Sequence, residues 1–268
     1  MKRTTDPTDL APATISESDG VRYLHLGTPW VQGAMRIRKP LGLELEYIQR
    51  MMAWMLLRPE AELAGGEGGV ALQFGLGAAA ITRYCHGVLK LRTAAVELNP
   101  TVIDACRLWF KLPPDGPRLH VQQGDAAAFA ADPAHREVAA SLCDDLYDHE
   151  AASPVLDSAA FYADCHAVLV DGGVMSVNLF GRDASFERSA ARFADAFGAE
   201  RVASLRPTRE GNTVVLALKN AAWPERATLA ARADNIERRY QLPARKWLRM
   251  IRPWMADAAA APDRVPTP

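Results

Sequence analysis

The sequence predicts an α/β fold built on a central, mostly parallel sheet with an antiparallel hairpin near its C-terminal end. From Val70–Phe74 onward, short apolar runs alternate with helix-forming stretches, which is the pattern of a sheet covered by helices on both faces. Beyond the last of these helices, the runs 201–205 and 213–219 flank Arg209-Glu-Gly-Asn212, which is typical of a hairpin.

The elements follow one another in a simple order. Residues 21–45 place short apolar runs between glycines and prolines and predict a small β appendage. Apolar positions at helical spacing over 43–57 predict a helix that Pro59 ends. The main domain is then expected to have strands over 70–74, 93–97, 119–122, 138–143 and 174–179, with helices over 78–85, from Pro100, over 157–169 and over 185–197.

This order predicts one principal domain with additions at both ends. We expect a disordered tail over 1–20, a β/helix segment over 21–64, a cofactor-binding catalytic domain over 65–220, a helical extension over 221–256 and a second disordered tail over 257–268.

Composition excludes several classes of protein. The 268 residues are 49% hydrophobic and 24% charged, and 31 Lys and Arg nearly balance 32 Asp and Glu. No bulk charge is therefore expected to hold nucleic acid or a membrane surface, and no stretch reaches the roughly 18 apolar residues of a membrane span. Four cysteines, Cys85, Cys106, Cys143 and Cys165, lack zinc spacing, so we expect reduced packing residues and no metal. The start of the sequence has no apolar core of signal-peptide length, so we expect a cytoplasmic location.

Gly75 and Gly77 lie at the turn from the first strand of the main domain into a helix. In an open α/β sheet, ligands bind beyond the carboxyl ends of the strands, and glycines let the backbone approach a ligand closely. The third glycine of the dinucleotide fingerprint is absent, because Ala78, Ala79 and Ala80 follow. The loop therefore predicts a cofactor site, with a nicotinamide dinucleotide disfavoured.

Carboxylates end the next two strands. Glu97 lies about 22 residues after Gly75, where it would accept bonds from both ribose hydroxyls, although a helix-capping or solvated glutamate has the same pattern. Asp125, within Gly124-Asp125-Ala126, would accept an adenine amine while a neighbouring amide meets a ring nitrogen. A simple turn aspartate is the alternative. The ordered succession of glycine loop, Glu97 and Asp125 favours one nucleoside site.

The fourth strand ends in a concentration of acid: Asp144, Asp145 and Asp148. Such a cluster is expected to attract a cationic substrate. Crowded carboxylates also raise the pKa of one another, which suits one of them to accept a proton near neutral pH. A solvated acidic loop is the alternative interpretation.

Together these residues resemble the spermidine-synthase-like family of polyamine aminopropyltransferases over about residues 30–219. The matching motifs are Gln32 in Val31-Gln-Gly-Ala-Met35, Tyr47 in Leu45-Glu-Tyr47, Gly75-Leu-Gly77, Val96-Glu-Leu-Asn-Pro100, Gly124-Asp-Ala126, Asp145-Leu-Tyr-Asp148, and Gly172-Gly173 with Val177-Asn-Leu179. The resemblance implies the Rossmann-like class I methyltransferase fold and a homodimer.

The resemblance also implies roles. Gly75, Gly77, Glu97, Asp125 and Ala126 would hold decarboxylated S-adenosylmethionine, with Gln32 on the wall of the same cleft. Asp145 would be the base that accepts a proton from the attacking small-molecule amine, whose aminopropyl transfer it promotes. Tyr47 and Asp148 would bind that amine.

Two positions depart from the family pattern. Ala78 stands where an aspartate usually binds the cofactor amine, and Ile48 stands where a histidine usually follows the tyrosine. Loss of the acid weakens the preference for the decarboxylated cofactor, so S-adenosylmethionine and a methyltransferase activity are the first alternative. A non-catalytic nucleoside-binding or scaffold protein is the second.

Overall fold

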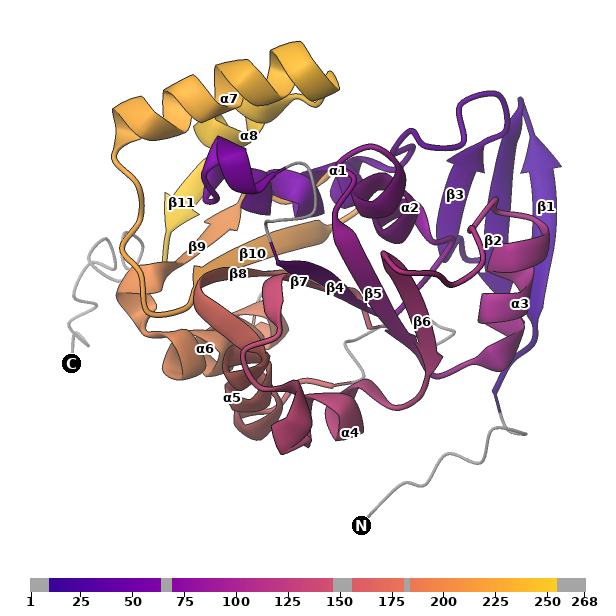
Figure 1. The fold of residues 1–268 in the computed structure, drawn as a ribbon, viewed down its shortest axis with the longest axis horizontal. Coiled ribbons are helices and arrows are strands. Elements are labelled where there is room, and N and C mark those ends of the chain that lie inside the picture. The colour runs from indigo at the N-terminus through magenta and orange to yellow at the C-terminus, as the bar shows by residue number, and fades with distance from the viewer. Residues whose placement is uncertain (1–9, 64–68, 147–155, 181–183, 255–268) are drawn as a thin grey trace, which may run out of the picture.

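The computed structural model describes residues 10–63, 69–146, 156–180 and 184–254, which form a large and a small sheet (Figure 1). The large sheet has eight strands in the spatial order β11-β9-β10-β8-β7-β4-β5-β6. In chain order these strands are β4 (Val70–Phe74), β5 (Arg92–Glu97), β6 (Leu119–Gln123), β7 (Ala139–Asp144), β8 (Leu169–Phe180), β9 (Val202–Leu205), β10 (Asn212–Leu218) and β11 (Ile251–Pro253).

The predicted fold class is confirmed by the strand directions. Strands β6, β5, β4, β7 and β8 pair in parallel, whereas β10 is antiparallel to both β8 and β9. The carboxyl ends of the five parallel strands therefore lie along one edge of the sheet. Strand β11 was not predicted: it comes from the C-terminal extension and pairs antiparallel with β9, so that Ile251 lies opposite Leu205.

Helices cover both faces of the sheet, as Figure 1 shows. On one face α4 (Ala126–Ala131), α5 (Ala159–Val168) and α6 (Ala184–Phe197) pack in a core that includes Phe74, Tyr162 and Phe193. On the other face lie α1 (Glu46–Met51), the 3-10 helix Met52–Leu56, α2 (Ala80–Gly87), α7 (Arg226–Tyr240) and α8 (Ala244–Met250). The C-terminal extension is thus packed on the sheet, with Trp247 only 1% exposed.

The helix expected over 43–57 is shorter than predicted. The α-helical hydrogen bonds end at Met51 and a 3-10 helix continues to Leu56. Every residue from Met51 to Leu57 is buried. The sequence therefore has no alternation of polar and apolar residues here that could indicate the change from α-helix to 3-10 helix. The methionines here are core residues. The four cysteines are free and buried as expected, and burial raises the pKa of the Cys85 thiol to about 12.

The small sheet corrects the tail expected over 1–20. Strand β1 (Ala13–Ser18) pairs antiparallel with β2 (Val21–Leu26), which pairs with β3 (Gly33–Arg36), and α3 (Pro100–Leu108) packs beside them. The amide of Ala13 also donates to Thr101 Oγ1 at 2.9 Å. Ser16, Glu17 and Ser18 of β1 are exposed on an edge strand, and this polar composition explains why the sequence predicts a tail here. Residues 1–9 and 257–268 lie outside the described residues.

Candidate active site

The loops after four parallel strands meet at the carboxyl edge of the large sheet. Backbone hydrogen bonds join these ends in succession: Gly124 donates to Glu97, Gly75 to Val96 and Asp145 to Phe74, each at 3.0 Å. Asp125 follows Gly124 directly. The sequence-predicted residues Gly75, Glu97, Asp125 and Asp145 therefore share one edge of the sheet.

The glycine loop is shaped by close backbone contact. Gly75 has φ +76°, and a Cβ atom there would lie 2.4 Å from the carbonyl oxygen of Asp145, so only glycine fits. Gly77 has φ +50°, and its Cβ would lie 3.1 Å from the carbonyl oxygen of Gln32. The loop is packed between the Asp145 backbone and the N-terminal segment.

The side chain of a buried glutamine also stabilises the glycine loop through hydrogen bonds. Gln73, 3% exposed on β4, donates from Nε2 to the carbonyl of Gly75 at 2.7 Å. Its Oε1 accepts from the amide and the hydroxyl of Thr82 on α2, at 3.1 and 2.6 Å. Sequence reasoning did not identify this positioning pair, although a glutamine inside an otherwise apolar strand was a visible signal.

Glu97 is held by backbone amides. Its Oε2 accepts from the amide of Leu76 at 2.7 Å and its Oε1 from that of Asn99 at 2.8 Å. Burial raises the pKa of this carboxyl, whereas the amide bonds oppose the shift. Asn99 itself caps α3, accepting from Thr101, so the helix-capping alternative for Glu97 is wrong. A carboxylate has about four lone-pair sites, so Glu97 keeps acceptor capacity beyond its backbone amides for a ribose hydroxyl.

Asp125 begins α4 as its N-cap. The side-chain Oδ1 accepts from the amides of Ala127 at 2.7 Å and Ala128 at 3.3 Å. In the described part of the chain Oδ2 carries no hydrogen bond, and the side chain is exposed. The interpretation of Asp125 as a simple turn aspartate therefore accounts for Oδ1 but assigns no role to Oδ2. Ala126, the first helical residue, has an amide without a partner within the helix.

Asp145 is held by side chains from two distant elements. Its Oδ1 accepts from Asn178 Nδ2 on β8 at 2.9 Å, and its Oδ2 accepts from the hydroxyl of Tyr47 on α1 at 3.2 Å. Burial raises the pKa of Asp145, and both hydrogen bonds oppose that rise. A partly exposed carboxyl with a raised pKa and fixed orientation has the properties of a general base.

A second asparagine extends this arrangement. Asn178 Nδ2 also donates to Asn212 Oδ1 at 3.1 Å, and the amide of Asn212 donates to Thr208 Oγ1 at 3.1 Å. Asn178 had been noted only within its motif, and Asn212 and Thr208 had not been singled out. The polar Asn178 between apolar neighbours on β8 was the available signal.

Asp144, the last residue of β7, and Asp145, which follows it, do not share one surface. Successive strand residues point to opposite faces, and Asp144 is 3% exposed with Oδ1 unpartnered among the described residues. Burial, and then the charges of Asp145 and Asp157, raise the pKa of Asp144 far above its usual range. Asp144 therefore favours its neutral form and would add little attraction for a cation. Asp148 lies outside the described residues.

The N-terminal segment closes over the glycine loop. A Cβ atom at Gly33 would lie 2.6 Å from the Cβ of Ala78, and Ala78 is 2% exposed. Gln32 is partly buried, and its carbonyl oxygen lies beside Gly77. Across the described residues, no group of three or more His, Cys, Asp and Glu could hold a metal ion, and no helix is long and apolar enough to span a membrane.

Several known proteins are similar to this chain over most of its length. No model of a known protein family matches the chain. A polyamine aminopropyltransferase of Neisseria meningitidis is 29% identical over 236 residues, which cover 87% of this chain and 86% of that protein. The chain is a homologue of the polyamine aminopropyltransferases. The resemblance inferred from the sequence motifs is thereby confirmed.

Solved structures of related fold agree with this homology. A probable spermidine synthase from Corynebacterium glutamicum superposes with a TM-score of 0.66 at 20% identity, covering 85% of this chain and 82% of that one. Human methyltransferase-like protein 13, in complex with SAH, gives 0.62 at 23% identity, covering 74% of this chain and 93% of that one. The aminopropyltransferase homologue therefore has the class I methyltransferase fold.

Proposed function

We propose that this protein transfers an aminopropyl group from decarboxylated S-adenosylmethionine to a small amine, with Asp145 as the base. The observation that carries the proposal is the geometry of Asp145: both carboxylate oxygens are held, and its backbone touches Gly75. The homologous aminopropyltransferases support the same reaction.

The described residues divide the work of such a reaction. When bound, the sulfonium compound supplies an electrophilic carbon and a sulfur leaving group. Glu97 would hold the ribose, and Asp125 with the amide of Ala126 would hold the adenine. Asp145 would take a proton from the substrate ammonium, and Tyr47 would orient that carboxylate toward it. The neutral amine would then form the new C–N bond as the C–S bond breaks and the neutral thioether leaves. Catalysis would rest on placement and on deprotonation of the nucleophile.

The direct test uses the full-length protein with putrescine and decarboxylated S-adenosylmethionine. We expect spermidine and methylthioadenosine to form in equal amounts, as measured by chromatography and mass spectrometry. Absence of both products at saturating substrate, with the protein folded and the nucleoside bound, would overturn the assignment.

A methyltransferase activity is the second candidate, and one observation favours it. Ala78 is packed against Gly33 and supplies no acid at the position where a family aspartate would bind the cofactor amine. A site without that acid does not repel the carboxylate of intact S-adenosylmethionine. Calorimetric titration with each of the two compounds separates the candidates: tighter binding of the intact compound would favour methyl transfer. Binding of neither would favour a non-catalytic role.

Two wider expectations accompany this function. We propose a homodimer and a cytoplasmic location, both from the family resemblance and the sequence composition. Sedimentation velocity of the purified chain tests the first, and fractionation of expressing cells tests the second.

A further inference from the structure

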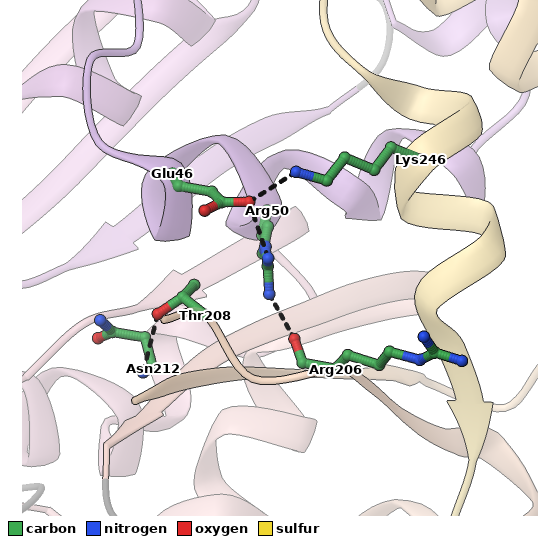
Figure 2. A network of polar contacts seen from close by, with 6 residues as sticks. All are labelled: Glu46, Arg50, Arg206, Thr208, Asn212 and Lys246. Carbon is green, nitrogen blue, oxygen red and sulfur yellow. Dashed lines mark hydrogen bonds and ion pairs between the residues drawn. The ribbon is translucent and has the colours of Figure 1, made fainter. Parts of the chain in front are cut away.

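Arg50 lies one turn after Tyr47 on α1 and is 5% exposed. Its guanidinium donates to the backbone carbonyl of Arg206, between β9 and β10, and to Glu46 at 2.8 Å (Figure 2). Burying a guanidinium is costly unless its N–H groups find acceptors. The bond from Arg50 to the distant Arg206 carbonyl therefore favours one position of α1 on the sheet.

The 206–212 segment, whose Arg206 carbonyl binds Arg50, is also connected to Asp145 through hydrogen bonds. Within it, the amide of Thr208 donates to the carbonyl of Asn212 at 2.8 Å, and the amide of Asn212 donates to Thr208 Oγ1 (Figure 2). Asn212 Oδ1 in turn accepts from Asn178 Nδ2, the same group that donates to Asp145. One partner of Asp145 is therefore tied to this segment.

The other partner of Asp145 is Tyr47, on the same short helix as Arg50. The contacts form a closed ring: α1 reaches Asp145 through Tyr47, and it reaches Asn178 through Arg50, the 206–212 segment and Asn212. Arg50 is the member of the ring that joins its two arms.

The outer end of the network contributes less. Glu46 also accepts from Lys246 of α8 at 2.9 Å (Figure 2), but the Lys246 side chain is 53% exposed. Ion pairs of that kind are screened by water and add little. The buried Arg50 is therefore the residue to test.

We propose that Arg50 is a positioning residue that fixes Tyr47 and Asn178 relative to each other, and thereby orients the carboxylate of Asp145. The effect of this residue on turnover rests on the proposed function, whereas its effect on Asp145 does not. Tyr47 and Asn178 both donate to the charged carboxylate, so loosening them raises the pKa of Asp145 further.

The chain contains a matched control in Arg58. This arginine is 9% exposed, donates to the carbonyl of Gly172 at 2.9 Å and pairs with Glu62 four residues on, just as Arg50 pairs with a glutamate four residues away. Gly172 lies in the irregular start of β8, and the regular strand between Val174 and Asn178 alone spans about 13 Å. Arg58 thus makes the same kind of contacts far from the base.

The experiment compares Arg50→Met, Arg50→Lys and Arg58→Met with the wild type. The titration of Asp145 is followed by carboxyl ¹³C NMR on the free protein, and the pH profile of kcat is measured with putrescine and decarboxylated S-adenosylmethionine. For Arg50→Met we expect the Asp145 titration and the rising limb of kcat to move to higher pH, with kcat down about tenfold at pH 7 and an unchanged KM for the nucleoside. Arg50→Lys, with one donor group left, is expected to lie between.

Arg58→Met is expected to lower the melting temperature while leaving the Asp145 titration at its wild-type position. An unshifted titration in folded Arg50→Met would overturn the proposal, as would an equal shift in Arg58→Met. If Arg50→Met does not fold, Arg50→Lys decides the question by the same titration. A wild-type protein without aminopropyl transfer would sink the proposed function alone, because the NMR titration requires no substrate.

Discussion

The two halves of the candidate site are built in different ways. The nucleoside half consists of the glycine loop, Glu97 and Asp125, and its two carboxylates are held by backbone amides: Asp125 Oδ1 accepts from amides two and three residues ahead. The base half consists of Asp145 and its partners, and it is held by side chains: Tyr47 lies 98 residues away in the chain and Asn178 lies 33 away.

This difference has a consequence for what each half tolerates. Backbone amides keep their places through most substitutions, so the nucleoside half depends on the path of the loop and on few side chains. Each side-chain partner can be changed by a single substitution, so the base half offers more positions at which a mutation alters the reactivity of Asp145. Of the two departures from the family pattern, Ile48 lies on α1, which also carries Arg50 and serves the base half, whereas Ala78 lies beside the glycine loop.

Replacement of the base should separate the halves most strongly. Asp145→Asn retains the shape of the side chain but cannot accept a proton from the amine. Turnover should fall by about 10²–10⁴-fold, while the calorimetric Kd for methylthioadenosine stays within about threefold of wild type because the nucleoside half is unchanged. Turnover close to wild type would show that Asp145 is not the base.

Substitution of Gly75 should break both halves together. Alanine at φ +76° is strained, and its Cβ would lie 2.4 Å from the Asp145 carbonyl oxygen. We expect Gly75→Ala to lower the free energy of unfolding by about 2–4 kcal/mol in urea titrations. Gly116→Ala is the control, because a Cβ at Gly116 would meet no atom within 4 Å. Equal stability of the two variants would contradict the packing described for the loop.

Asp144 offers a comparison within β7 itself. A buried acid with a raised folded pKa binds its proton more tightly in the native state, so its contribution to stability is present below the ordinary aspartate pKa and is lost as pH rises through the folded value. The unfolding free energy of the wild type should therefore fall as pH rises above about 4. In Asp144→Asn this fall should be less steep, by up to about 1.4 kcal/mol per pH unit. Urea titrations from pH 4 to pH 8 measure it, and parallel curves for the two proteins would refute it.

The sequence was a better guide to the nucleoside half for the same structural reason. Gly75, Glu97 and Asp125 each follow a parallel strand directly, and parallel strands of an α/β sheet end at one edge. Recognising the strands was therefore enough to bring these residues together, without knowledge of any side-chain contact.

The base half required information that is not local. Asn178 lies opposite Val214 in the antiparallel pair, so Asn212, two residues earlier, becomes its diagonal neighbour on the same face only in that register. The contact of Arg50 with the Arg206 carbonyl likewise depends on how α1 docks. Strand β11 was missed for a similar reason: its three residues become a strand only by pairing with β9.

The smallest expected effect distinguishes capping from recognition at Asp125. Asp125→Ala removes the N-cap of α4 and should cost about 1 kcal/mol of stability. Asp132→Ala is the control for the loss of a cap: it removes the 2.9 Å bond from the amide of Ala134 in the following 3-10 helix and should cost a similar amount of stability. Asparagine caps as well as aspartate, so Asp125→Asn should keep full stability. It should still weaken methylthioadenosine binding, because an amide nitrogen then faces the adenine amine in place of the second carboxylate oxygen. Calorimetry and thermal unfolding of all three variants give both quantities, and unaltered affinity in both Asp125 variants would leave Asp125 as a cap alone.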